Sequence, residues 1–421
     1  MANNSKFVIE LHVGKEYAVG RMNCDSTGRN KDILFNGKRY HRISSQSKKY
    51  AWRKDMAEYF KERKHVYKTR SICDVFESEL LKKDNEFYKN HAHELAKLIV
   101  TNILGCKFDD DDADVPSTAQ VLVVTDYDVK DVLDVFCEKV ATEDDIKKLS
   151  SEKEKKKDDN NKTKSKTATK KGSLSGDIQK EILKRLPLRQ HGVECSLFGR
   201  MSTSGVMETV ESSICVNHSY SLGKASGDDD YFIVSENYMA KNGREVVAAN
   251  TNSGAGYLDS KDIAAGHVYY EYASVDVTHF YNNLCKGLDM EKPENKERVK
   301  GVLKETIMFL VDEILTAAPK GAQNSFATSP LPVGALIRIR DLGQNLTADN
   351  FCFEELNKYC NEKDKFINAM NNFVKYSKSN YRHYMKDIFV AFSDEKKADC
   401  GECMNLSDAI DTIGEMIDER F

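Results

Sequence analysis

Apolar residues recur at two different spacings along this chain, and each spacing predicts a different kind of element. Residues 7–13 alternate apolar and polar side chains as a half-buried strand does, whereas residues 72–81 place apolar side chains three or four positions apart, as a helix does. The same criteria predict strands at 7–13, 120–125, 214–219, 267–275 and 336–340, and helices at 56–64, 72–81, 90–103, 129–140 and 297–317.

The order of these elements predicts a fold. A strand, a group of helices, two strands, a long helix and a last strand are the succession of a ferredoxin-like or RRM-like (RNA-recognition-motif) domain with a large helical insertion. We therefore predict the α+β class, with a ferredoxin-like palm.

The composition is typical of a globular protein. The 421 residues are 40% hydrophobic and 31% charged, which allows one large core or two smaller ones. No apolar run approaches the length of a membrane span, and residues 1–13 lack both the basic start and the apolar core of a signal peptide. We therefore expect a cytoplasmic protein without a membrane partner.

The cysteines predict neither a disulfide framework nor a metal centre. There are eleven, an odd number, scattered singly in apolar contexts, which is typical of reduced core thiols. Cys400 and Cys403 form a CxxC pair, but zinc needs two more ligands, and Cys360 and His383 upstream do not form a second pair. We expect two loop thiols and no metal or other cofactor.

The densest group of basic, hydroxyl and aromatic side chains is KDILFNGKRYHRISSQSKKYAWRK at 31–54. The Asn-Gly pair at 36–37 predicts a bend, and Ser44 or Ser45 can cap a helix that follows. A helix N-terminus carries unpaired N–H groups and a partial positive charge, so Ser44, Ser45 and Gln46 can donate hydrogen bonds to phosphate there. The segment is suited to a phosphate backbone and not to bases.

Lys49 and Arg53 are four residues apart and therefore share one face of the predicted helix. The net charge of −4 does not exclude a nucleic-acid partner, because acidic stretches such as the five aspartates at 108–114 can mask a basic surface in the total. The alternative is that these basic side chains are merely solvated charge on an amphipathic helix.

Residues 150–176 differ from the rest of the chain in composition. They contain nine lysines against four acids and very few apolar side chains. Such a segment cannot bury enough surface to offset the entropy of ordering it, so we predict a disordered insertion. It either solubilises the protein or adds loose electrostatic contact with nucleic acid.

The basic segment also resembles a family signature. GKRYHRISSQSKKYAWRK is similar, almost position by position, to that of the CasC-type backbone subunit (RAMP superfamily) of the type I-E CRISPR Cascade complex. VLVVTDYDVKDVLDVFCEKV, LFGRMSTSGVME, AAGHVYYEYASVDV and PKGAQNSFA resemble the same family in the same order, so the likeness covers most of residues 8–326.

The resemblance implies a function and an architecture. The function is a non-catalytic subunit that oligomerises along a CRISPR RNA and presents it for pairing with target DNA in antiviral defence. The implied partners are CRISPR RNA, target DNA through guide pairing, further copies in a filament and other Cascade subunits. The implied parts are a palm at 1–54, 193–222 and 257–345, helical fingers at 55–192, a thumb at 223–256 and a C-terminal helical region at 346–421.

Family positions extend the candidate RNA-binding residues beyond the basic segment. The full set is Arg21, Lys31, Ser44, Gln46, Lys49, Arg53, Met201, Tyr231, Phe232, Lys320, Gln323 and Asn324. By resemblance, Tyr231 and Phe232 on the thumb support the displacement of one guide nucleotide at a regular interval; a local hydrophobic cluster or a subunit contact is the alternative. Met201 matches a position that packs against the kinked nucleotide, with core packing as its alternative.

The other matches concern loops. Lys320, Gln323 and Asn324 fall in a family loop near the guide, where their donors suit phosphate and ribose hydroxyls. Arg21 stands near the place of a family arginine, which either Arg21 fills after a short insertion or Cys24 has replaced.

Two further features are expected to be structural. His218 also matches a family position, but a histidine in an apolar strand is usually a satisfied core residue. Tyr269, Tyr270 and Tyr272 invite comparison with the aromatic strand of RNA-recognition domains, but they lack its glycine pattern and are expected in the core or an interface.

The alternative function is a CRISPR-associated endoribonuclease of the same superfold. His12, His41, Asp25 and Asp32 lie close enough in sequence to supply acid-base chemistry. Nothing in their spacing pairs them, and the resembled subunits have no nuclease role, so we expect no catalytic residue.

Overall fold

The computed structural model divides the chain into two compact units. Unit 1 comprises Met1–Glu58, Cys215–Asp276 and Ile307–Phe421, and unit 2 comprises Tyr59–Ile214 and Val277–Thr306. The residues described are 6–60, 66–110, 116–159, 173–235, 255–319, 321, 323–327, 329–341, 345–353, 361–381, 384–392 and 401–421. Within them, no helix combines the length and the apolar character needed to cross a membrane.

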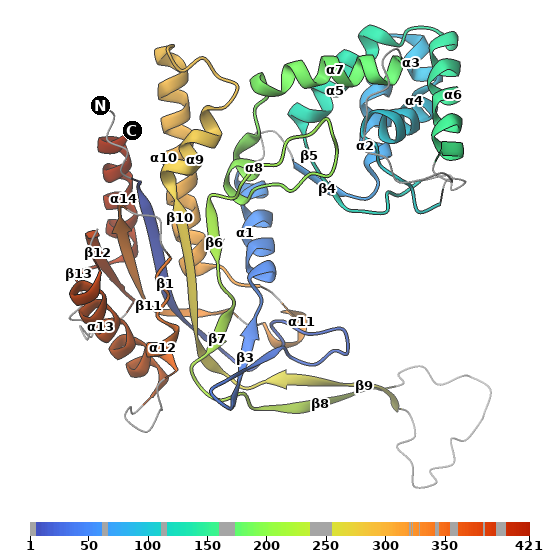
Figure 1. The fold of residues 1–421 in the computed structure, drawn as a ribbon. Helices are drawn as coiled ribbons and strands as arrows, with labels where there is room; N and C mark the ends of the chain where they lie inside the picture. Colours follow the sequence, from blue (N-terminus) through green and yellow to red (C-terminus); the bar gives the residue numbers. More distant parts are fainter. Residues whose placement is uncertain are drawn as a thin grey trace, which may run out of the picture. The chain divides into compact units, whose positions relative to one another are not determined.

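Unit 1 is built on a mostly antiparallel sheet (Figure 1). Among the described residues it has nine strands, in the order β13-β12-β11-β1-β10-β7-β3-β2, with β6 also paired to β10. Only β12 and β13 are parallel among the strand pairs whose register is described. The strands are β1 (Val8–Tyr17), β2 (Asp32–Phe35), β3 (Lys38–Ile43), β6 (Ile214–Val216), β7 (Ser219–Ser221), β10 (His267–Asp276), β11 (Leu331–Arg340), β12 (Tyr384–Ala391) and β13 (Glu402–Met404).

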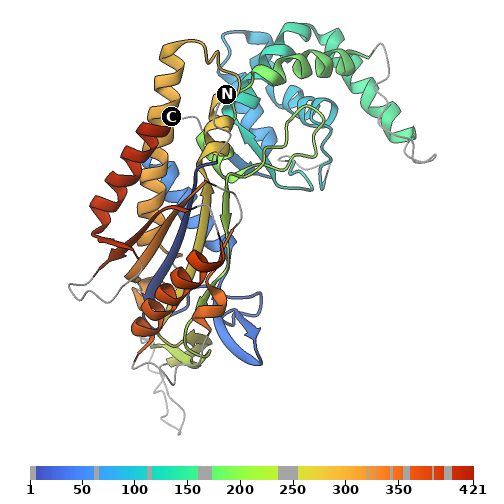
Figure 2. The same ribbon diagram turned by 60° about the vertical axis from the view of Figure 1, so that its left-hand side comes forward.

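Strand β1 lies between β10 and β11, and Figure 2 shows this blue strand inside the sheet. It is buried along almost its whole length, so the alternation expected of a half-buried strand has another cause. The polar positions carry internal partners: Glu10 binds Arg340 (3.0 Å), and Lys15 lies 3.4 Å from Glu271. Glu10 and Lys15 of β1 therefore form buried ion pairs and do not face solvent.

Helices cover the sheet of unit 1. They are α1 (Ser45–Tyr59), the second half of α10 (Pro293–Thr316), α11 (Gln323–Phe326), α12 (Asp349–Cys352), α13 (Glu362–Asn380) and α14 (Leu406–Arg420). Helix α13 buries Phe366 and Phe373 against Leu336 of β11. Gly14 of β1 makes room for Phe366, because a Cβ there would lie 2.8 Å from the ring. The mixture of sheet and helices agrees with the predicted α+β class.

A separate hairpin is formed by β8 (Gly227–Ser235) and β9 (Ala255–Ala264), which run antiparallel (Figure 1). The predicted thumb ended at residue 256, whereas the returning strand continues to Ala264. Within the hairpin, Tyr231 and Phe232 pair with Ser260 and Asp259 of β9. Residues 236–254 lie outside the described residues.

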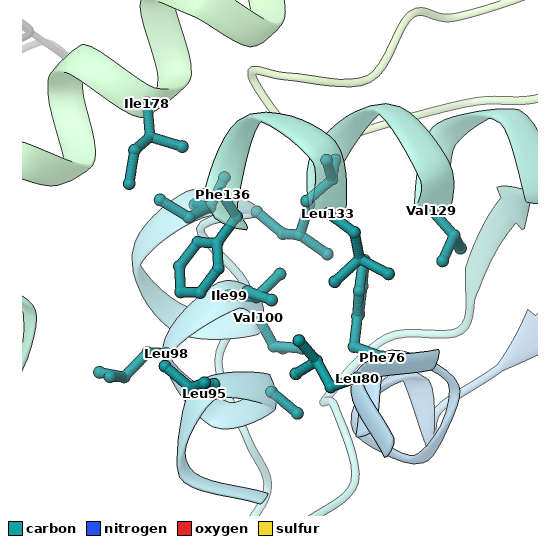
Figure 3. Close-up of a cluster of buried hydrophobic side chains, with 14 of the residues drawn as sticks. Phe76, Leu80, Leu95, Leu98, Ile99, Val100, Val129, Leu133, Phe136 and Ile178 are labelled. Carbon is teal, nitrogen blue, oxygen red and sulfur yellow. The ribbon is translucent and has the colours of Figure 1, made fainter. Parts of the chain in front are cut away.

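Unit 2 is largely helical. Its elements are β4 (Val66–Thr69), α2 (Ile72–Leu81), α3 (Glu86–Asn90), α4 (Ala92–Leu98), a π-helical turn (Ile99–Ile103), β5 (Leu122–Thr125), α5 (Asp126–Lys139), α6 (Glu143–Asp159), α7 (Leu174–Arg185), a 3-10 turn (Leu186–Leu188), α8 (Gly192–Phe198), α9 (Val277–Cys285) and the first half of α10. Side chains such as Phe76, Leu133 and Phe136 point toward one another in its core (Figure 3). Residues 193–214, predicted as palm, belong to this unit, where Asn283 of α9 donates to the Ser196 carbonyl of α8 (3.0 Å).

The prediction that residues 150–176 are disordered is wrong at both ends of the segment. Helix α6 continues to Asp159, and α7 begins at Leu174. The carboxylate of Glu152 accepts from the N–H of Leu174 (2.8 Å) and from the hydroxyl of Ser175 (2.6 Å). Buried apolar residues just outside the segment, such as Leu149, anchor the helices that extend into it. Residues 160–172 lie outside the described residues.

Candidate nucleic-acid interface

The β2–β3 hairpin carries the first half of the basic segment. Asn36 and Gly37 have φ angles of 48° and 72°, the left-handed conformation that a two-residue hairpin turn requires, so the predicted bend is confirmed. Just before β2, the backbone of Lys31 accepts from the N–H of Arg42 (2.8 Å) and donates to the carbonyl of Asn23 (2.9 Å). The hairpin therefore fixes Lys31 beside β3.

Helix α1 follows β3 directly, and Ser44 is its N-cap. The Ser44 hydroxyl accepts from the N–H of Ser47 (3.3 Å), which confirms one of the two predicted caps. The N–H of Ser45 donates to Nδ1 of His218 (3.0 Å). The N–H of Gln46 has no acceptor among the described residues, and Gln46 is exposed. One donor at the positive end of the helix is thus left for a ligand.

His218 lies where four basic side chains meet. Burial lowers the pKa of its imidazole, and four positive charges lower it further: Arg42, Lys48, Lys31 and Lys49. Because Nδ1 accepts a hydrogen bond, the proton of the neutral ring is on Nε2. His218 was expected to be a satisfied core residue, but it is half-buried and accepts a hydrogen bond within a basic cluster.

Lys48 is the buried member of this cluster. Its side chain is 1% exposed, and its Nζ has no hydrogen-bond partner among the described residues. Burial lowers the pKa of Lys48 to about 8, while the charge of Glu271 opposes that shift. Burial also disfavours the Glu271 carboxylate, but Lys15 and Lys48 outweigh it and lower its pKa. A buried carboxylate therefore supports the positive charge of α1.

The other face of α1 carries Lys49 and Arg53, both half-buried. Burial lowers the pKa of Lys49, and the charge of Arg53 adds to the effect, so the two cations lie close together as predicted. Sequence reasoning missed Lys48. The signal was present, because Trp52 and Met56 follow it at four-residue intervals and are buried on the same face.

The side chain of Arg21 contacts two residues of the loop that follows it. Its Nε lies 3.0 Å from Sγ of Cys24, and its guanidinium donates to the carbonyl of Gly28 (2.5 Å). The two residues considered for the family position therefore contact each other. Gly321 packs on the Arg21 carbonyl so closely that no side chain would fit there. This contact brings the chain before α11, which carries the exposed Asn324, to the same loop.

The remaining predicted residues belong to other elements or lie outside the described residues. Lys320 lies outside the described residues, and Gln323 is the first residue of α11. Tyr231 and Phe232 lie on β8. Met201 belongs to unit 2 and is 85% exposed, which excludes core packing as its role in this chain.

The loop that carries Met201 is held by buried charges of unit 2. Arg200 and Val210 exchange two backbone hydrogen bonds of 2.8 Å, and the guanidinium of Arg200 binds Asp128. Asp128 also accepts from Arg189 (3.1 Å). Burial favours its neutral form, but the Arg200 charge lowers the pKa of Asp128 overall. Met201 is therefore an exposed side chain on a loop that is held in place by buried ion pairs.

The groups considered for acid-base chemistry each have another partner. His12 is buried, its Nδ1 lies 2.9 Å from the Tyr270 hydroxyl, and burial lowers its pKa well below the ordinary value. Nε2 of His41 contacts the backbone of Ser226. Asp25 accepts from the N–H and the hydroxyl of Thr27, and both carboxylate oxygens of Asp32 accept from Nη1 of Arg39 (2.7 and 2.8 Å). Asp32 lies opposite His41 in the register of the β2–β3 hairpin, but each of the four side chains is held by a different partner.

The three tyrosines of β10 and Cys403 of the CxxC pair differ in burial. Tyr269, Tyr270 and Tyr272 are buried on β10, as predicted for core aromatics. Cys403 is exposed, and Cys400 lies outside the described residues. Within the described part of the chain, no group of three or more cysteine, histidine or acidic side chains is arranged to hold a metal ion.

One family model, described as CT1975-like protein, matches residues 9–419, which is nearly the whole chain. The chain belongs to the CT1975-like protein family. Among curated proteins, none matches this sequence.

Two solved chains share the fold of this CT1975-like protein. One, from a "CRISPR RNA-guided surveillance complex, pre-nicking", is 16% identical, with a TM-score of 0.67 over 98% of this chain and 100% of that chain. The other, from a "CRISPR RNA-guided surveillance complex", is 14% identical, with a TM-score of 0.63 over 97% of this chain and 99% of that chain. Family and fold together confirm the resemblance to a Cascade backbone-type subunit predicted from the sequence.

Proposed function

We propose that this CT1975-like protein is a non-catalytic backbone subunit that binds CRISPR RNA, oligomerises along it and presents its bases to target DNA. The observation that carries the proposal is the concentration of positive charge at the N-terminus of α1. Lys31, Arg42, Lys48 and Lys49 all act on His218 there. Phosphate groups are the ligands that such a site favours.

The chemistry of the cluster suits an RNA backbone of any sequence. A helix N–H and ammonium groups bind phosphate oxygens, which are the same at every nucleotide. The protein would then hold the shape of the guide while base pairing reads the target, as in other RNA-guided systems. A basic helix face that is only solvated would not need a buried lysine supported by Glu271.

The sheet supports the predicted ferredoxin-like palm. The elements β1, α1, β7, β10, α10 and β11 follow one another along the chain. In the sheet, β11 lies beside β1, then β10, then β7, which is the strand order of a ferredoxin-like domain. We propose that the β8–β9 hairpin is the thumb, which its antiparallel pairing supports.

The partners follow from the relatives. The two similar solved chains come from complexes whose titles name RNA-guided surveillance. For this chain we propose CRISPR RNA, other Cascade subunits, further copies in a filament and guide-paired target DNA as partners, in the cytoplasm. Each of His12, His41, Asp25 and Asp32 is held by another partner, which supports a binding role over an endoribonuclease.

Copurification with RNA tests the proposal. Expressed together with a CRISPR array and its partner subunits, the protein should elute with RNA of one uniform length and in more than one copy per RNA. Labelled guide and target RNA incubated with the complex should remain uncut. A protein that elutes as an RNA-free monomer, or that cleaves either strand, overturns the proposal.

A further inference from the structure

A cavity of about 230 Å³ opens within unit 2, lined by residues of α8, α9 and α10. Much of its wall is apolar and comes from Val193, Leu284, Leu288, Val299 and Val302. Its volume is below the roughly 300 to 1,000 Å³ of pockets for drug-sized ligands. The space therefore suits a group the size of one large side chain.

Two buried polar atoms at the cavity lack partners. Ser196, 0% exposed, and His191, 4% exposed, both line it. The hydroxyl of Ser196 and Nδ1 of His191 have no hydrogen-bond partner among the described residues. An unsatisfied buried polar atom costs about 1 to 3 kcal/mol, so a ligand that supplies a hydrogen bond recovers that cost.

The protonation of His191 decides which hydrogen bond it offers. Burial lowers the pKa of His191 to about 4, and the charge of Lys286 adds to the shift, so the ring is neutral near pH 7. Its Nε2 lies 3.7 Å from a carboxylate oxygen of Glu208, which favours the proton on that nitrogen. Nδ1 is then an acceptor, and the cavity calls for a donor on the ligand.

A positive charge at the rim of the cavity sets a second requirement for the ligand. Arg298 is exposed, lines the cavity and has no carboxylate within ion-pair distance among the described residues. Lys286 nearby is already paired with Glu208. A single available guanidinium suits one carboxylate and is poorly matched to a polyphosphate, which several cations would have to neutralise.

We propose that this cavity binds one tryptophan or tyrosine side chain from an acidic segment of a partner protein. The ring would fill the apolar space, its N–H or O–H would donate to Nδ1 of His191, and a neighbouring carboxylate would pair with Arg298. Aromatic side chains with a polar tip are the usual anchors of protein interfaces. This interaction is separate from guide binding.

The probe for the test is N-acetyl-5-fluorotryptophan, observed by ¹⁹F NMR because the protein carries no fluorine. Its signal should shift saturably with added protein. The corresponding amide, which lacks the carboxylate, should bind severalfold more weakly, as should the acid to Arg298→Glu. Lys296→Glu, on the same helix outside the cavity, should bind the acid nearly as wild type does. Val193→Phe and, separately, Val302→Phe should abolish binding by filling the space.

A capped Glu-Trp-Glu peptide should bind at least tenfold more tightly than Glu-Ala-Glu. The proposal is overturned if wild-type protein gives no saturable shift at millimolar probe, if Lys296→Glu weakens binding as much as Arg298→Glu, or if guide RNA displaces the probe. Binding of the amino-acid probe without any preference for the tryptophan peptide also overturns it, in favour of a small-molecule site. Guide binding by Arg298→Glu should be unchanged, which separates this test from that of the proposed function.

Discussion

Nδ1 of His218 lies 3.0 Å from the backbone nitrogen of Ser45. The contact joins the loop between β6 and β7 to the first residue of α1, far away in the sequence. One N–H of the helix is thereby satisfied by an imidazole whose pKa is lowered by burial and then by four cations. The negative charge of a phosphate bound here would instead favour the protonated imidazole.

Guide binding should therefore take up protons at His218. Its folded pKa is lowered, so the free protein keeps the ring neutral and loses stability as pH falls below about 6.5, where the unfolded chain binds the proton. A bound phosphate favours the charged ring, whose Nδ1 then releases the Ser45 N–H so that this N–H can donate to the phosphate, and affinity should rise as pH falls from 7.5 to 5.5. Fluorescence anisotropy with labelled guide measures this.

The matched variant is His218→Asn, whose side-chain oxygen can accept from Ser45 but does not titrate. It should lose the pH-dependent part of the affinity and bind within about threefold of wild type at pH 8. His279→Asn, in unit 2, serves as the control. An identical pH profile in wild type and His218→Asn would show that the imidazole does not meet phosphate.

Replacing Lys49 and Arg53 together by alanine should weaken guide binding without unfolding the protein, since both side chains are only half-buried. Each lost phosphate contact lowers the slope of log K against log salt by about 0.7 for a single strand. Titrations at several salt concentrations measure this slope. Lys54→Ala, exposed on the same helix, should change it less. An unaltered slope and affinity in the double variant would remove both residues from the site.

Glu152→Ala should destabilise unit 2 by about 1 kcal/mol, because the carboxylate accepts from the first turn of α7. Urea unfolding measures the change. Deletion of residues 160–172 with a short glycine-serine bridge should have a smaller effect, and guide-dependent assembly should persist in both variants. Equal stability of Glu152→Ala and wild type would mean that this contact does not order the helix.

Replacing Tyr231 and Phe232 on β8 by alanine should leave RNA bound, since the cations of α1 remain. If the two rings stack on bases, their loss removes about 1 to 3 kcal/mol per base and with it the regular displacement of nucleotides. Chemical reactivity mapped along the assembled guide reads this out. Retention of the same periodic pattern would assign the aromatics to packing.

Local features were predictable and distant contacts were not. The turn at 36–37 and the Ser44 cap follow from a few neighbouring residues, and the structure has both. The role of His218 depends on a helix N–H brought close only by the sheet, so its apolar neighbours in sequence were misleading. The burial of Lys48 was predictable from its spacing with Trp52 and Met56, but its supporting carboxylate, Glu271, lies on a strand more than half the chain away.

Composition was the least reliable guide at the lysine-rich segment. Its charge argues for disorder along its whole length, yet each end continues a helix that is anchored outside the segment by buried residues such as Leu149 and Ile178. The average composition of a segment does not show that its first and last residues continue neighbouring helices. Whether the ends of such a segment are helical depends on the elements that precede and follow it.

The contact between Glu152 and the start of α7 holds the two sides of residues 160–172 near each other. A foreign domain whose own ends are close together could therefore be spliced in at this point with little strain on either helix. A fluorescent protein inserted here would label every copy at an internal position and leave both chain ends unmodified. Counting the bleaching steps of single assembled particles would then give the number of copies directly.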